Sequence, residues 1–365
     1  MVKFPLYLKL SQVTLGLLGF FYILYIGQEI IVPLIFSIIL AILLNPLVNF
    51  FTRLKINRVI AISLAIVVMI VVIGGILFFI GSQASMFSDS FPELKQKFNE
   101  IAGRVLLWFS QTFHIGQGKI TAWIAKEKAA GMDGASGLVG DTLTSLSSAL
   151  VVILLIPVYI FLFLFYKPLL LQFIAKLFAS DQHAVVAEVL HETRQLIQNY
   201  LIGLLIEMAI VAVLNSTALL IIGIKYAILL GVIGAILNII PYIGGIIAIA
   251  LPMIMGLLTD NPKSSLFVLL GYIVVQLIDN NFLVPKIVAS KVKVNALVSI
   301  VVVLIGGALW GVSGMFLSIP LTAILKVTFD RIVYLEPFGF LLGDTMPDIG
   351  KAIFQIKMKR KKAES

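Results

Sequence analysis

The chain has 365 residues, of which 60% are hydrophobic and 12% are charged. Soluble domains carry about 25% charged residues, and several apolar runs here exceed the roughly 18 residues that mark a membrane span. The composition therefore excludes an ordinary soluble protein and predicts an all-α polytopic membrane protein. The net charge of +9 does not point to nucleic acid as a partner, because the lysines cluster at the ends of apolar segments, where the positive-inside rule places them.

The first 81 residues are predicted to form three transmembrane helices, near 11–26, 31–51 and 59–80. A basic N-terminus before an apolar run imitates a signal peptide, but no small-residue cleavage site follows, so we expect the first helix to be retained. Arg53, Lys55 and Arg58 place the loop after the second helix in the cytoplasm. The N-terminus is then cytoplasmic as well.

Two regions between the spans are predicted to lie outside the membrane. Residues 82–147 have balanced charge and should be extracytoplasmic, with an amphipathic helix followed by a glycine-rich loop. We interpret the helix as lying on the membrane or packing on its neighbours, with a ligand-binding lid as the alternative. After a further transmembrane helix at 148–166, residues 167–200 are predicted to form a cytoplasmic amphipathic helix, which either lies at the interface or couples to gating.

The segment 201–333 carries the most informative feature, two apolar stretches of the wrong length at 228–258 and 297–325. At about 30 residues each, they exceed the roughly 20 residues of one crossing and fall short of two. Residues 238–245 interrupt the first stretch and residues 306–314 interrupt the second. Broken helices at membrane depth survive only where protein or a watery cavity satisfies the freed backbone groups. We therefore predict that this segment is the transport core.

Charge counting gives the two stretches a predicted topology. If both are re-entrant hairpins, six full transmembrane helices remain, including spans near 201–223 and 264–282, and the lysine-bearing loop 284–296 lies in the cytoplasm. If each stretch is a single kinked crossing, this loop lies outside. Length and charge together favour hairpins that enter from opposite faces, as in the inverted repeats of transporters. The basic tail 334–365 places the C-terminus in the cytoplasm in either case.

Catalytic and metal-binding constellations are nearly absent from the sequence. The three histidines are too scattered for an H-E-x-x-H site, and no phosphate-binding G-x-x-x-x-G-K-[ST] loop occurs. Serines beside glycine have no histidine within a span to activate them. Cysteine is absent, which removes thiol chemistry. We therefore expect no enzyme activity, no cofactor and no metal site.

Two carboxyl groups within the predicted spans are the strongest candidates for transport chemistry. Glu207 lies about two turns into its helix, and Asp279 ends the sixth full span, just before Asn280. An ionisable group inside a membrane is a functional hypothesis by default. Because removal from water disfavours the charged form, such a carboxyl can load and release a proton near neutral pH or pair with a cation. The alternatives are an interfacial Asp279 paired with Lys286 and a structural hydrogen bond for Glu207.

The residues at the two breaks complete the predicted pathway. Asn238, Pro241, Gly244 and Gly245 can expose backbone carbonyls or amide dipoles to a substrate, although glycine in membrane helices also serves close packing. The full set predicted to line a substrate or ion pathway is Glu207, Asn238, Pro241, Gly244, Gly245, Asp279, Asn280, Pro285, Gly306, Gly307, Gly311, Gly314 and Pro320.

The same segments resemble the autoinducer-2 exporter (PerM-like) family of bacterial membrane proteins. The resemblance covers about 201–333 in order and spacing, and a proline motif in the second span extends it. The motifs are Asn238-x-x-Pro241-Tyr242-Ile243-Gly244-Gly245 with Pro252, Asp279 followed by Pro285-Lys286-Ile287-Val288, Gly306-Gly307-x-x-x-Gly311-x-x-Gly314, Pro320-Leu321 and Ala41-x-Leu43-Leu44-Asn45-Pro46. Many members carry a His-Pro-like pair before the last stretch, where this chain has Asn295-Ala296, and this departure leaves the cargo open.

The resemblance implies a multi-pass protein of the bacterial inner (cytoplasmic) membrane that forms a homo-oligomer, a pentamer being one such form. Some members are described as exporters of autoinducer-2 and others as sodium/proton antiporters. Our leading hypothesis is a secondary exporter of a small polar solute, an autoinducer-2-like signalling molecule or a metabolite, along a path lined by the broken helices. A monovalent cation/proton antiporter is the alternative. A membrane scaffold that binds a partner through 82–147 is a second alternative.

Overall fold

The described residues of a computed structural model are 5–89, 154–241, 244–259, 263–289 and 292–344, with 96, 97, 100, 103 and 261 as isolated additions. Within them every regular element is a helix, and the one β contact is an isolated bridge between Val294 and Gly343. The predicted all-helical class is therefore confirmed. Of the predicted extracytoplasmic region 82–147, the described part is mainly its start, which continues a helix to Asp89, and the rest of that prediction lies outside the described residues.

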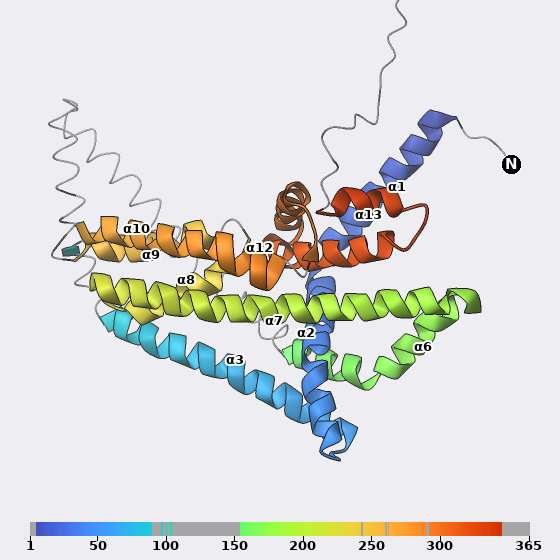
Figure 1. Cartoon of the computed structure of the whole chain (residues 1–365), viewed down its shortest axis with the longest axis horizontal. Coiled ribbons are helices and arrows are strands. Elements are labelled where there is room, and N and C mark those ends of the chain that lie inside the picture. The colour runs from blue at the N-terminus through green and yellow to red at the C-terminus, as the bar shows by residue number, and fades with distance from the viewer. Residues whose placement is uncertain are drawn as a thin grey trace, which may run out of the picture.

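The helices follow the chain as α1 (Leu6–Ile26), α2 (Gln28–Arg53), α3 (Arg58–Asp89), a helix at Leu154–Phe165, α6 (Lys167–Leu177), the 3-10 turn η1 (Ser180–Gln182), α7 (His183–Ile222), α8 (Ala227–Asn238), α9 (Gly244–Leu257), α10 (Lys263–Ile278), the π-helical segment η2 (Asp279–Ala289), α12 (Ala296–Phe329) and α13 (Glu336–Leu342) (Figure 1). Among the described residues, five helices are long and apolar enough to cross a membrane. A sixth is counted if the helix at Leu154–Phe165 and the bent α6 form one span. The helices do not form a parallel bundle, because α2 passes across α7 (Figure 1).

The longest element is α7, a single helix of 40 residues that measures about 60 Å at 1.5 Å per residue. The sequence indicated a cytoplasmic helix followed by a separate span, but no proline interrupts this segment. The amphipathic first half therefore continues directly into the apolar second half. The helix ends at Gly223, whose φ of +83° is a left-handed conformation that glycine adopts at low cost.

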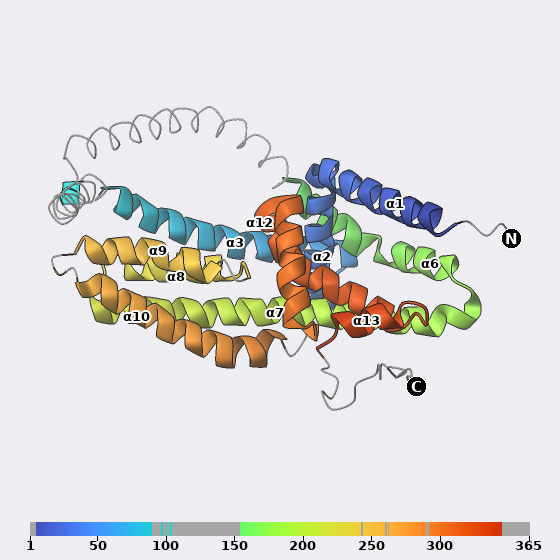
Figure 2. The ribbon, with the colours of Figure 1, turned by 90° about the horizontal axis from the view of Figure 1, so that it is seen from above.

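The three largest apolar cores of the described residues pack around α7 and α2. The first half of α7 packs against α2, η2 and α12 through residues that include Ile39, Ile197 and Leu317. The C-terminal half lies beside α8, α9 and α10 (Figure 2), with Leu219 and Val268 fully buried between them. A third core joins α2, α3 and the helix at Leu154–Phe165. The first two cores hold the helices that surround the site described below.

The first broken stretch is a helical hairpin made of α8 and α9. The chain leaves α8 at Asn238 and re-enters a helix at Gly244, which lies directly against the backbone of Leu237 and Asn238. Glycine also allows close helix packing on both sides of the hairpin. Gly231 lies on the backbone of Ser216 in α7, and Gly256 lies on that of Ser265 in α10. The sequence-predicted interruption is thus a real break, and its two arms are held by small residues.

The second broken stretch also folds back on itself. Within α12, Trp310 and Gly311 leave the helical conformation, and Gly311 has a φ of +59°. In a straight helix, Gly306 and Gly314 would be separated by about 12 Å along the axis. Instead, Gly314 packs directly on the backbone carbonyl of Gly306. The chain therefore reverses direction at Trp310, and the two arms are in contact where both lack a side chain.

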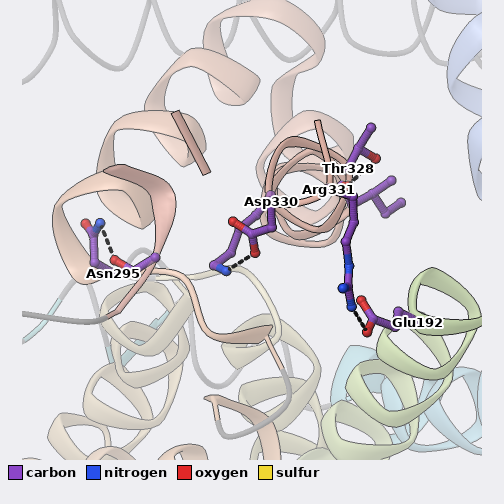
Figure 3. A network of polar contacts seen from close by, with 8 residues as sticks. Glu192, Asn295, Thr328, Asp330 and Arg331 are labelled. Atoms are coloured by element: carbon purple, nitrogen blue, oxygen red, sulfur yellow. Dashed lines mark hydrogen bonds and ion pairs between the residues drawn. The ribbon is translucent and has the colours of Figure 1, made fainter. Parts of the chain in front are cut away.

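Polar contacts tie both ends of α12 to other helices: Arg331, just after its C-terminal end, reaches α7, and Asn295, at its N-terminal end, reaches the end of α13 (Figure 3). Arg331 reaches Glu192 at 2.6 Å and Glu188 at 2.7 Å, both on the first half of α7. Asn295 caps α12 by accepting from the Val298 amide at 2.9 Å, and its side-chain amide donates to the Leu341 and Gly343 carbonyls of the α13 end. Exposed ion pairs contribute little stability by themselves, but the contacts of Asn295 fix where the second hairpin begins.

Replacing Gly314 with alanine is expected to destabilise the protein, because the added methyl would overlap the Gly306 carbonyl. Overpacking of this kind costs about 1–3 kcal/mol, so the melting temperature of the detergent-purified protein should fall by several degrees. The matched control is Gly74→Ala in α3, where nothing lies within 4 Å of the new methyl. If Gly314→Ala had the same melting temperature as the control and the wild type, the reversal of α12 would be contradicted.

Candidate functional site

A cavity of about 790 Å³ lies among α7, α8, α9, α10, η2 and α12. This volume is in the range of small-molecule sites. Ile239 and Pro241 from the turn between α8 and α9 line the cavity, so the break in the first hairpin is part of its wall. The sequence-predicted pathway residues that line it are Glu207, Asn238, Pro241, Gly245, Asp279 and Asn280.

Helix periodicity and a wide turn place the acidic residues at this cavity. Tyr200, Leu204 and Glu207 recur at steps of four and three, so they share the face of α7 that looks into the cavity. Asp279 is the first residue of η2, where α10 widens into π-helical turns. Such turns are frequent at functional sites. Pro285 lies inside this segment and cannot donate the backbone hydrogen bond that a regular α-helix would need.

The two carboxyl groups are buried and face each other. The exposed fraction is 2% for Asp279 and 6% for Glu207, and both side chains line the same cavity, close enough to interact electrostatically. The amide nitrogen of Asn238 donates to Oδ2 of Asp279 at 2.9 Å. Asp279 is therefore a buried member of a polar network with α8 and α10.

Gln276 is a member of this network that sequence reasoning missed. Its Nε2 lies 3.4 Å from Oδ2 of Asp279 and 3.2 Å from Oδ1 of Asn280. A Cβ at Gly245 would come within 2.7 Å of Gln276 Oε1, so the glycine makes room for this side chain. The sequence spacing could have predicted it, because Gln276 lies three residues before Asp279 and hence on the same helix face.

Polar atoms without a partner mark the same region of the described structure. Oε2 of Glu207, Oδ1 of Asp279, Oδ1 of Asn215 and the Tyr272 hydroxyl are buried and have no hydrogen-bond partner. Tyr272 lines the cavity from α10, where Gly234 of α8 lets its hydroxyl come close. A buried polar atom that lacks a partner costs about 1–3 kcal/mol. Because the carboxyl oxygens of Glu207 and Asp279 are acceptors on residues that line the cavity, the site suits a ligand that brings donors or positive charge.

The second broken stretch contributes less to this cavity than the sequence indicated. Ala296, Ser299 and Ile319 are its lining residues. The structure does not bring the other predicted members to the cavity wall, and they are Gly244, Pro285, Gly306, Gly307, Gly311, Gly314 and Pro320. Gly306 and Gly314 pack the arms of α12 on each other, while Ser318 donates to the Gly314 carbonyl at 2.5 Å.

Comparison with known proteins agrees with this architecture. The family model described as "AI-2E family transporter" matches residues 15–334. The putative transport protein YhhT of Escherichia coli K12 is 26% identical over 93% of this chain and 94% of its own length. The AI-2 transport protein TqsA of the same strain is 26% identical over 87% and 90%, and its putative permease PerM is 26% identical over 51% and 52%. The chain belongs to the AI-2E transporter family, whose members are multi-pass membrane transport proteins.

Proposed function

We propose that this transporter is a secondary exporter of a small polar solute, such as an autoinducer-2-like signalling molecule or a metabolite. The observation that carries the proposal is the buried cavity with the facing carboxyl groups of Glu207 and Asp279. Its volume admits a solute of several heavy atoms, which a site built for a bare ion would not need. Hydroxyl groups of such a solute would supply the donors that the unpaired acceptor atoms lack. One relative, TqsA, is named as an AI-2 transport protein.

The proposed membrane arrangement has six full crossings, two re-entrant hairpins and both termini in the cytoplasm of a bacterial inner membrane. Its support is the length of α8 and α9, with 12 and 14 residues. These correspond to about 18 and 21 Å, short of the roughly 30 Å of a bilayer core. Each arm is therefore too short to cross the bilayer core, and residues of the turn between the arms line the cavity. The large exposed apolar surface of α1 and α3 supports contact with lipid or with further copies in a homo-oligomer.

In this mechanism the two carboxyl groups hold one proton between them when the cavity is empty. Two carboxylates in contact in a buried site repel each other strongly, so a shared proton is the stable arrangement. Asn238 and Gln276 orient Asp279 through its Oδ2. A solute that donates to Glu207 and Asp279 replaces the shared proton as their partner. Binding and proton release are then linked, which is the coupling that secondary transport requires.

A monovalent cation/proton antiporter is the second candidate, favoured by the same facing carboxyl groups. A cation without its water shell needs oxygen ligands, and Glu207, Asp279 and Asn280 present side-chain oxygens at the cavity. In that reading the cation and the proton compete for one pair of carboxyl groups. The scaffold alternative depends on 82–147, which lies mostly outside the described residues, so no observed contact favours it.

Asp279→Asn is expected to abolish coupled transport while leaving the protein folded, since asparagine keeps the size of the side chain but cannot exchange a proton. In everted vesicles, an antiporter gives cation-dependent proton movement that disappears in this variant. The matched control is Asp330→Asn, which removes an exposed acid paired with Lys326 outside the cavity. Wild-type coupling in Asp279→Asn would contradict both candidate functions.

Export of a polar solute is tested by comparing metabolites in the medium of a deletion strain and of the same strain carrying the wild-type protein. The exporter proposal predicts at least one polar metabolite that is depleted from the medium without the protein and restored by it. The strain carrying Asp279→Asn should resemble the deletion. Identical media together with a clear cation/proton signal in vesicles would overturn solute export and leave antiport.

Water access to the cavity is tested with single cysteines, because the native chain contains none. Ser299→Cys faces the cavity and should react with a water-soluble maleimide in the purified protein. Ser318→Cys is the control in the same helix, where the side chain is 7% exposed and hydrogen-bonded to Gly314. Equal labelling of both positions, or protection of Ser299→Cys, would contradict an open cavity.

A further inference from the structure

Three positively charged residues outside the cavity, Arg58, Lys167 and Arg194, lie on α3, α6 and α7. The guanidinium of Arg58 donates to the Leu164 carbonyl at 2.9 Å. Lys167 Nζ donates to Asn45 Oδ1 at 3.0 Å. Arg194 lies one helical turn before Gln198, whose Nε2 donates to the Ile42 carbonyl at 2.7 Å, three residues before Asn45 in α2. Among the described residues, no carboxylate forms an ion pair with any of these three cations.

The atoms of this cluster that lack a hydrogen-bond partner are donors, whereas the unpartnered carboxyl oxygens at the cavity are acceptors. Nδ2 of Asn45 and Nε of Arg194 are buried and have no hydrogen-bond partner. Water would accept the hydrogen bonds of an exposed donor, but these two nitrogens are shielded from solvent. Their desolvation is therefore uncompensated. Surplus positive charge and orphaned donors together fit a ligand that is an anion with several acceptor oxygens.

The cluster lies at the ends of two apolar helices. Arg58 is the first residue of α3, the most hydrophobic of the candidate spans. Lys167 is the first residue of α6 and lies two residues after the end of the apolar helix Leu154–Phe165, where the chain bends by 64°. Residues at such positions lie at the boundary between the bilayer core and water. The positive-inside rule places this boundary on the cytoplasmic side, where anionic lipids attract basic residues.

The bent helix α6 supplies a surface for acyl chains beside these charges. None of its residues is buried, and Leu169, Phe173 and Leu177 are all exposed. A short amphipathic helix with exposed apolar residues next to basic ones is typical of segments that lie in the membrane interface. The occupant that matches both features has an anionic oxygen-rich head and an apolar tail.

We propose that Arg58, Lys167, Arg194 and Asn45 bind the phosphate group of an anionic phospholipid, whose acyl chains lie along α6. The guanidinium of Arg194 and the ammonium of Lys167 face the phosphate oxygens, and Nδ2 of Asn45 donates to one of them. This site is independent of the transported solute, because it shares no residue with the cavity. The bound lipid would fix the angle between α6 and α2, which the Lys167–Asn45 hydrogen bond already joins.

The test measures lipid retained by the full-length protein. Wild-type protein and variants are purified in detergent with equal phosphatidylglycerol and phosphatidylcholine, washed, and examined by native mass spectrometry. The charge-removing variants are Lys167→Gln, Arg194→Gln and their combination. Lys176→Gln is the matched control, a basic residue exposed on the same helix outside the cluster. Arg58→Gln, at an exposed position, serves as a further variant if the substitutions at the partly buried Lys167 and Arg194 impair folding.

Wild type and Lys176→Gln are expected to retain phosphatidylglycerol in preference to phosphatidylcholine. The double variant should bind it about tenfold more weakly, the factor expected for losing charge-assisted hydrogen bonds. Equal retention by all variants, or no preference between the two lipids, would overturn the proposal. Inorganic phosphate forms a separate arm. If phosphate alone raises the melting temperature of the wild type and phosphatidylglycerol does not, the site takes a soluble anion, and the lipid assignment is wrong.

Discussion

Two carboxyl groups buried in an apolar interior impose the strongest constraint on this structure. The chain is 60% hydrophobic, and a charged group buried in such an interior costs much free energy unless it is paired and hydrogen-bonded. Glu207 and Asp279 meet that requirement through each other and through Asn238 and Gln276. These four residues come from α7, α8, α10 and η2. The helices must therefore converge at this point, and the cavity forms where they do.

The convergence of these helices places two requirements on the backbone of the transport core: close approach between helices, and partners for backbone groups at the helix break. Helices can approach closely only where side chains are small, and Gly203, Gly231 and Gly256 lie on the backbones of η2, α7 and α10 respectively. The break between α8 and α9 frees backbone groups that must face protein or water, and its residues Asn238 and Pro241 line the cavity. The break and the acidic pair are thus parts of one site.

Sequence reasoning found the parts of this site that carry a strong local signal. Charge inside an apolar run marked Glu207 and Asp279, and an anomalous length marked the first hairpin. It missed Gln276, because a neutral amide near the end of a span does not carry the free-energy cost of a buried charge and so does not stand out in the sequence. It also assigned the glycines of the second stretch to the pathway, although Gly306 and Gly314 pack the arms of α12 on each other. Local pattern does not distinguish a glycine that exposes backbone to a substrate from one that admits a neighbouring helix.

The central claim is that Glu207 and Asp279 act as one unit in transport. The most direct measurement compares flux in proteoliposomes for Glu207→Gln, Asp279→Asn and the double variant. Residues that work as a unit give strongly non-additive losses. The account predicts that each single change reduces flux by the same large factor and that the double variant loses no more. A double loss equal to the product of the two single losses, or wild-type flux in either single variant, would contradict it.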